Sequence, residues 1–412
     1  RLTHMGELDM AKPASGIAAL MKKLRGSSSD SNKPASGERQ MALLRRLPKI
    51  LRFIPGKAQD LRAWFLSMQY WLGGSDDNIE AMIRFLVARY ASRTEWRGIR
   101  AAAPVDYPDV GLYHPDAHDP QWGRITTDPA RLPRPAGANG TVGLLMLRSY
   151  LLAGDTAHYD AVIRALEGQG LAVLPAFASG LDGRPAIEAY HQGRIDALVS
   201  LTGFSLVGGP AYNDSPAAVA TLSALDVPYI AAHPLEFQTL GQWAGAAGGL
   251  GPVETTMLIA LPEIDGATNP TVFAGRHGED GCNGCVGGCK AEADGCARAM
   301  AACPERIGHL ADKVARIVRL RRSKLADRKV AIVLYGFPPN AGAVGTAAYL
   351  SVFESLYNTL HAMAEEGYPV SPLQHRRLAR LVPRLAGSSA APFLLDAEGA
   401  APAPGALHRQ PV

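Results

Sequence analysis

From residue 141 onward, short apolar runs alternate with longer amphipathic segments. The apolar runs predict buried strands at 142–147, 172–177, 197–201 and 227–230. Between them, apolar positions spaced three and four residues apart predict helices at 159–169, 185–192 and 215–225. Buried strands joined by helices are typical of a parallel sheet covered on both faces. We therefore predict an α/β fold in which parallel-sheet layers follow an α-helical N-terminal region.

The N-terminal part of the chain has a helical pattern instead. Segments 59–71 and 76–90 carry apolar or aromatic side chains at helical spacing. Gly73 and Gly74 are expected to end the first helix, and Ser75 or Asp76 can cap the second. We interpret the aromatic stripe as core packing.

The changes of pattern divide the chain into six parts. We predict a helical region (1–100), an irregular connection (101–140), an α/β domain (141–276), a Cys-rich insert with a helix (277–328), the start of a further α/β unit (329–370) and a divergent tail that we expect to be disordered (371–412). In the further unit, a strand is predicted at 330–335 and a helix at 346–366.

Three glycine-bearing loops follow predicted strands, at 148–155, 202–210 and 337–345. Ligands of open parallel sheets bind at such loops, so each is either a ligand-facing loop or a tight turn. No loop contains the Gly-Lys-Ser/Thr of a Walker motif, and none is a good G-x-G-x-x-G. The sequence therefore does not support a nucleotide site.

Composition narrows the class of protein. The chain has 412 residues, 47% of them hydrophobic, and a net charge of +4, which is too small to indicate a nucleic-acid partner. No apolar run approaches the ~20 residues of a membrane span, and no leader pattern is present, so we expect a cytoplasmic protein.

The N-terminal region is basic. Residues 1–62 hold thirteen Lys or Arg against five Asp or Glu, much of this on predicted helices at 17–25 and 41–53. This charge is either a solvated helix face or a patch for an acidic partner. Since the chain starts at Arg1, we expect a fragment.

All five cysteines lie within 22 positions, with the spacing C-x2-C-x3-C-x6-C-x6-C. They are Cys282, Cys285, Cys289, Cys296 and Cys303. Thiolates gather in this way around a soft metal, and clustered cysteines in the cytosol favour metal over disulfides. We predict a metal site, with a 4Fe–4S cluster favoured because all ligands are sulfur. Zinc, redox thiols and no bound metal stay open, and in any four-ligand site one of the last three cysteines is spare.

Two pairs of polar residues follow predicted strands or helices. His233 and Glu236 come after the strand at 227–230, where they could face a ligand or ease proton movement. The alternative is that His233 is a hydrogen-bonded structural residue. Glu263 and Asp265 precede Gly266 and are expected to have a helix-end or turn role.

Two further groups carry weaker signals. His114, Asp116 and His118 could bind a metal, although no third ligand is fixed by the sequence. Tyr349 and Phe353 are expected in the core.

Four segments in order along the chain resemble one family. They are 69–78 (QYWLGGSDDN), 199–210 (VSLTGFSLVGGP), 261–276 (LPEIDGATNPTVFAGR) and 335–350 (YGFPPNAGAVGTAAYL). They resemble the large porphyrin-binding subunit, known as the H subunit, of magnesium chelatase, which is related to the cobaltochelatase large subunit. The likeness runs to about residue 370, and the Cys-bearing insert is more similar to the bacteriochlorophyll-pathway branch.

The resemblance implies a subunit that binds protoporphyrin IX and presents it for Mg²⁺ insertion in (bacterio)chlorophyll biosynthesis. ATP would be hydrolysed by two separate ATPase-type partner subunits. The family's His-Gly-Thr-His-Gly run is absent from these 412 residues, so no catalytic or ring-contacting residue is carried over. We hypothesise that the tail after residue 370 reflects a frameshift or a truncated gene copy. Two alternatives are a non-catalytic remnant that binds porphyrin or partner subunits, and an iron–sulfur α/β binding protein of unknown ligand.

Overall fold

The computed structural model describes residues 58–91, 93, 96, 98–209, 213–276, 278, 299–332, 346–347 and 350–370. The predicted helices at 17–25 and 41–53, Tyr349, four of the five cysteines and the tail lie outside these residues. The chain forms two compact units, Arg1–Val314 and Ala315–Val412. Each unit is described by itself.

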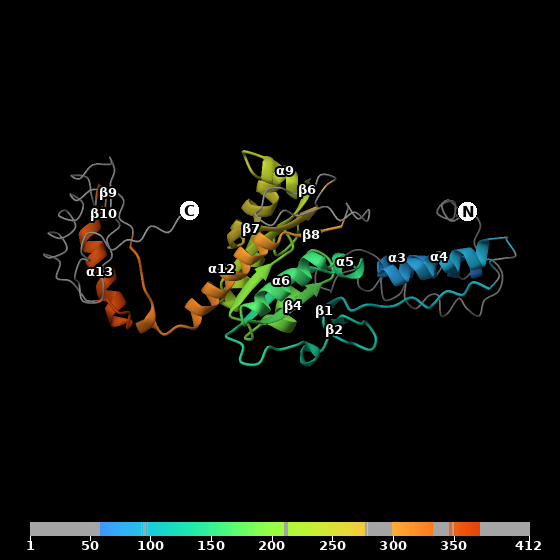
Figure 1. Cartoon of the computed structure of the whole chain (residues 1–412), viewed down its shortest axis with the longest axis horizontal. Coiled ribbons are helices and arrows are strands. Elements are labelled where there is room, and N and C mark those ends of the chain that lie inside the picture. The colour runs from blue at the N-terminus through green and yellow to red at the C-terminus, as the bar shows by residue number, and fades with distance from the viewer. Residues whose placement is uncertain are drawn as a thin grey trace, which may run out of the picture. The chain divides into compact units, whose positions relative to one another are not determined.

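Two helices open the described part of the first unit (Figure 1). α3 spans Ala58–Gly73, slightly longer than the predicted 59–71, and α4 spans Asp76–Tyr90, as predicted. The Ser75 hydroxyl caps α4 by accepting a hydrogen bond from the Asn78 backbone N–H at 3.2 Å. A short connection between helices favours antiparallel neighbours, and α3 packs against α4.

The prediction that the aromatic stripe is core is only partly correct. Phe65 is buried, but Trp71 and Ile83 are 64% and 55% exposed, and Tyr90 is also exposed. A helix that packs against one partner encloses only one stripe of its surface. Among the described residues these side chains lie outside that stripe.

An eight-stranded sheet forms the centre of the first unit. Its order is β2-β1-β4-β3-β5-β6-β7-β8. The strands are β1 (Val110–Tyr113), β2 (Ile125–Thr126), β3 (Thr141–Leu147), β4 (Ala172–Ala178), β5 (Ala197–Ser200), β6 (Tyr229–Thr239), β7 (Thr268–Arg276) and β8 (Ala301–Ala302). The five strands from β4 to β7 in this order pair in parallel, and the outer strands pair antiparallel. The predicted α/β fold with a parallel sheet is confirmed.

Helices cover both faces of this sheet. α6 (Ala157–Gly168) packs against β4, as does the helical segment formed by α7 (Arg184–Ala186) and the π-helical Ile187–His191. α8 (Ser215–Leu225) shares an apolar cluster with α7 and the strands. Every residue of β4 is buried, on both faces, as expected for a sheet between two helical layers.

The connecting elements are short. They are α5 (Arg148–Leu152), α9 (Leu240–Gly245), α10 (Pro252–Glu254), the π-helical Thr255–Ala260, α11 (Leu261–Ile264) and the 3₁₀ turn Pro129–Arg131. In the described ranges, no helix combines the length and the apolar character that crossing a bilayer demands.

Four strands, β1, β2, β6 and β7, differ from the prediction. The region 101–140, expected to be irregular, contains β1 and β2, because Val110–Leu112 pair antiparallel with the distant residues Ala176–Ala178 of β4. β6 continues to Thr239, well past the predicted end at residue 230. β7 was not predicted, since its polar start and its glycine hide the apolar run Val272–Ala274.

The second unit also departs from the pattern. α12 (Pro304–Arg322) begins in the first unit and is followed by a 3₁₀ turn, Leu325–Asp327. Residues 330–332 of the predicted strand have no regular structure, and Val330 is 50% exposed, so it lacks the buried contacts that a strand needs. The predicted helix at 346–366 begins only at Val352 as α13 (Val352–Glu365), because β9 (Thr346–Ala347) and β10 (Leu350–Ser351) pair instead.

Candidate functional site at the carboxyl edge of the sheet

The order in which successive strands are added to the sheet changes direction at β3. This makes the edge of the sheet at the carboxyl ends of the strands a candidate site. After β3 the chain adds β4 on one side and then crosses to β5 on the other. In doubly wound sheets the loops diverge at this point, and ligands bind in the crevice outside the carboxyl ends of the strands. The crevice between β3, β4 and β5 has a volume of about 20 Å³, which is room for roughly one water molecule.

A buried carboxylate holds the loop that follows β5. Asp265 accepts hydrogen bonds from the Ser205 hydroxyl at 2.6 Å, the Leu206 backbone N–H at 2.9 Å and the Asn213 side-chain amide at 3.3 Å. Asp265 also ends α11, so its predicted helix-end role is confirmed, while Glu263 is exposed. Asp265, which lies far along the chain, therefore fixes the conformation of the predicted loop at 202–210.

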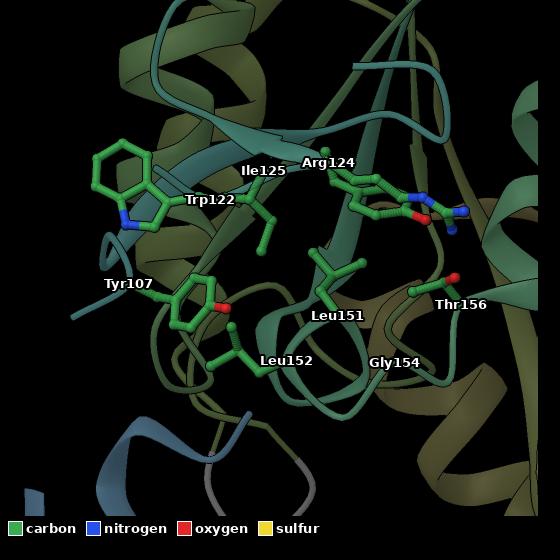
Figure 2. A pocket seen from close by; sticks show the side chains of 9 residues that line it. Tyr107, Trp122, Arg124, Ile125, Leu151, Leu152, Gly154 and Thr156 are labelled. Atoms are coloured by element: carbon green, nitrogen blue, oxygen red, sulfur yellow. The ribbon is translucent and has the colours of Figure 1, made fainter. Parts of the chain in front are cut away.

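A larger pocket of about 210 Å³ lies beside the loop that follows β3 (Figure 2). Figure 2 shows Tyr107 and Leu152 at one end of this pocket and Arg124 and Thr156 at the other. Its volume is below the ~300–1,000 Å³ typical of sites for drug-sized ligands, so it suits a small group or one edge of a larger ligand.

Hydrogen bonds hold one wall of this pocket in place. The Arg148 guanidinium donates to the Pro108 carbonyl at 2.9 Å and to the Tyr107 carbonyl at 3.1 Å. The Trp122 indole N–H donates to the Asp106 carbonyl at 3.0 Å. The segment 106–108 is thus fixed from two sides, which preorganises the wall that contains Tyr107.

Three polar side chains meet near the carboxyl ends of β6 and β7. The Tyr150 hydroxyl donates to the Glu236 carboxylate, and the Arg276 guanidinium lies 3.3 Å from the same carboxylate. Burial, and then the negative charge of Glu236, raises the pKa of the Tyr150 hydroxyl, so it stays protonated. Leu235 pairs with Gly275 in the sheet, which brings Glu236 and Arg276 together. This group is a candidate contact for a hydrogen-bonding ligand.

Two buried histidines have unusual surroundings. Within the described part of the chain, both ring nitrogens of His158 and of His233 lack a hydrogen-bond partner. Burial lowers the pKa of His158 to about 3 and that of His233 to about 4. The His158 ring lies against Tyr159 and Phe273, with centroids 3.9 and 6.1 Å apart. Both imidazoles are therefore neutral at pH 7.

The expectation that His233 and Glu236 follow the end of a strand is wrong. Both residues lie inside β6, which continues to Thr239. Glu236 binds Tyr150 and Arg276. The alternative interpretation of His233 as a hydrogen-bonded structural residue is also incorrect, because it is buried without a hydrogen bond.

Protein groups contact both ring nitrogens of His114. Its Nε2 lies 3.0 Å from the Glu167 carboxylate, and its Nδ1 accepts a hydrogen bond from the Asp116 backbone N–H at 3.1 Å. The Asp116 carboxylate binds Arg164, which lowers the pKa of Asp116. Within the described ranges, no three His, Cys, Asp or Glu side chains are grouped so that they could hold a metal ion.

Of the predicted metal ligands, the structure describes Cys303. This residue is buried in an apolar cluster with Leu235, Leu240 and Val272. Its backbone N–H donates to the Phe273 carbonyl at 3.0 Å, at the start of α12. Cys282, Cys285, Cys289 and Cys296 lie outside the described residues.

Sequence reasoning did not single out Tyr150 or Arg276. Tyr150 lies in the loop at 148–155 that was proposed to face a ligand, and Arg276 ends the segment 261–276. Those two signals were present, but only the register of β6 against β7 shows that the side chains meet.

The strand order, with helices on both faces, defines a doubly wound α/β protein whose candidate site is the carboxyl edge of the sheet. A sequence model of the CobN/Magnesium Chelatase family matches residues 68–394, and a second, described as a domain of unknown function (DUF3479), matches residues 1–65. The chain belongs to the CobN/magnesium chelatase family.

Three relatives show how close the similarity is. The chain is 70% identical over 373 residues to the magnesium-chelatase H subunit of Rhodobacter capsulatus, covering 90% of this chain and 31% of that protein. It is 36% identical over 391 residues to the chloroplastic magnesium-chelatase subunit ChlH of Oryza sativa subsp. indica, covering 90% and 26%. The solved catalytic subunit of cobaltochelatase from Mycobacterium tuberculosis matches with a TM-score of 0.55 and 26% identity, covering 76% of this chain and 23% of that one. The chain thus spans about a third of the length of these curated relatives or less.

Proposed function

We propose that this chain is part of the porphyrin-binding subunit of a magnesium chelatase. The complete subunit would present protoporphyrin IX for ATP-dependent Mg²⁺ insertion in (bacterio)chlorophyll biosynthesis, in the cytoplasm. The observation that carries this proposal is the 70% identity, over 90% of the chain, with a protein named as the H subunit of magnesium chelatase. Two ATPase-type subunits are the proposed partners, and the lack of a Walker motif in this sequence supports a separate site for ATP.

The edge of the sheet supports a binding role. A macrocycle needs an apolar surface for its ring and cationic or hydrogen-bonding groups for its carboxylates. The pocket beside Leu152 offers an apolar wall, and Arg276 with Tyr150 offers polar contacts. Since the described pockets are small, the remaining surface around the ring would come from other parts of the subunit.

Porphyrin binding can be measured directly with this chain. We expect it to quench the fluorescence of protoporphyrin IX in a saturable titration. Arg276→Gln should weaken binding by roughly 10- to 150-fold, because a charged hydrogen bond is worth about 1.5–3 kcal/mol. Arg134→Gln, at an exposed position away from the edge, is the matched control and should bind as the parent does.

The same titration separates the alternatives. If the chain shows no saturable quenching while the complete porphyrin-binding subunit does, porphyrin binding does not reside here. If it quenches but forms no Mg-porphyrin with the two ATPase subunits, ATP and Mg²⁺, it acts as a non-catalytic binding part. Mg²⁺ insertion would show that this chain has the catalytic groups as well.

We also propose that Cys282, Cys285, Cys289 and Cys296 bind an iron–sulfur cluster of the 4Fe–4S type. Their spacing supplies four thiolates, the usual ligand set of such clusters. The apolar surroundings of Cys303 support its being the spare fifth cysteine. A bound cluster would supply oxygen-sensitive redox chemistry or hold the insert together.

Anaerobic purification tests this site. We expect a coloured protein with about four irons per chain. Cys285→Ala should lose the iron, and the control Cys303→Ala should keep it. Stoichiometric zinc instead of iron would show that these cysteines form a zinc site rather than a cluster site. A metal-free protein would contradict the proposal.

A further inference from the structure

Positive charge is concentrated where α12 ends in the second unit. Six exposed cations lie within fourteen residues: Arg316, Arg319, Arg321, Arg322, Lys324 and Lys329. We call these six residues the basic surface. Asp327 is the one acidic residue between 316 and 329 in the sequence. The chain as a whole has a net charge of only +4, so this stretch stands apart from it.

Helix capping explains only a part of this charge. Cations in the last turn of a helix complement its dipole, and the effect falls off within that turn. Arg316 lies almost two turns before the end of α12, and Lys324 and Lys329 lie beyond it. Capping is done by another residue, Arg328, whose guanidinium donates to the Arg321 carbonyl at 3.3 Å and the Ser323 carbonyl at 3.2 Å.

We infer that the basic surface docks an acidic segment of another protein. Four of its six cations are arginines, which bind carboxylates through two parallel hydrogen bonds and are enriched at protein interfaces. Leu320 is 55% exposed among them and supplies an apolar contact. Charge complementarity with a central apolar residue is the pattern of a protein-docking surface.

A protein fits this surface better than a membrane does. Helices that bind a bilayer insert an apolar face into it. The apolar side of α12 is not available, because Leu310, Val314 and Val318 are each 1% exposed or less. The docking role goes beyond the proposed porphyrin binding, which uses none of these residues.

The test uses the full chain and a fluorescent peptide in which Glu alternates with Leu and Ala. Binding is followed by anisotropy at low and at physiological salt. We expect the triple variant Arg316→Glu, Arg319→Glu, Lys324→Glu to bind at least tenfold more weakly. A second triple variant with Gln at these positions should also bind more weakly, and it keeps the test valid if charge reversal unfolds α12.

The matched control is Arg100→Glu, Arg134→Glu, Arg194→Glu, which changes the net charge equally at exposed positions of the first unit. It should stay within about threefold of the parent. Leu320→Ser should weaken binding of this peptide severalfold but not that of a peptide with Ser in place of Leu.

Three outcomes would overturn the inference. An equal loss in the control triple would show that only net charge matters. Tighter binding to phosphatidylserine vesicles, or to a DNA duplex at the same salt, would assign the surface to a different class of partner.

Protoporphyrin quenching by the Arg316 triple variant should equal that of the parent. Failure of this inference and failure of the proposed function can therefore be distinguished.

Discussion

Buried histidines contribute to how the stability of this protein responds to pH. His158, His191 and His233 are all buried, and burial lowers their pKa values to about 3, 4 and 4. In the unfolded chain the pKa of histidine is ~6.5, so the unfolded state takes up a proton first as the pH falls. The stability that neutral burial provides is complete above pH ~6.5 and is lost progressively toward pH 3.

Substituting one of these residues should reduce that loss. When the pH falls from 7.5 to 5.5, each buried histidine lowers the unfolding free energy of the parent protein by about 1.4 kcal/mol. His158→Phe, which can still stack on Phe273, should remove that share. Urea unfolding at both pH values is the measurement, with exposed His309→Phe as the control. An unchanged pH difference in the His158 variant would show that His158 is protonated in the folded state.

Close contacts of β3 exclude a side chain at one glycine. A Cβ atom on Gly143 would lie 2.9 Å from the Ile195 Cδ1 and 3.0 Å from the His191 Cδ2. Both neighbours belong to the segment that leads from the π-helical Ile187–His191 into β5. The strand therefore needs glycine to let this segment approach it.

The matched comparison is between two glycine-to-alanine changes. Gly143→Ala should lower the unfolding free energy by about 1–3 kcal/mol through overpacking. Gly308→Ala, inside α12 where a Cβ meets no atom within 4 Å, should raise it by up to ~1 kcal/mol through helix propensity. Thermal or urea unfolding measures both, and equal shifts in one direction would refute the packing argument.

Elements differ in how far the sequence predicts them. The bounds predicted for α4 and α8 are those observed, because a capping residue and a regular apolar period are local properties. β1 was missed, since the four residues between Asp109 and His114 carry no strand signal without β4 beside them. The end of β6 was also missed, because its length depends on pairing with β7.

Long-range hydrogen bonds hold the first unit together around the insert. The Asp155 carboxylate accepts bonds from the Met300 backbone N–H at 3.1 and 3.2 Å, which ties the chain after residue 298 to the start of α6. The Gln169 amide donates to the Asp312 carboxylate at 2.7 Å, and this bond joins the end of α6 to α12.

Removing the first of these contacts should destabilise the whole unit. Asp155→Ala leaves the buried Met300 N–H without its acceptor and should cost about 1–3 kcal/mol of unfolding free energy. Asp155→Asn keeps one acceptor oxygen and should cost less. Urea unfolding followed by tryptophan fluorescence measures the difference, and an equal loss in both variants would mean that charge rather than the hydrogen bond matters.

The sequence by itself determined the class of this protein and most of its regular elements. Apolar periods, capping residues and the ordered family segments are local features of the sequence. The parallel α/β fold and the chelatase resemblance could therefore be predicted from them. Only the tertiary structure decided which side chains meet, such as Tyr150 with Glu236 and Asp265 with Ser205. These contacts join residues about 60 to 86 positions apart, and packing and strand register, which no local pattern encodes, bring them together.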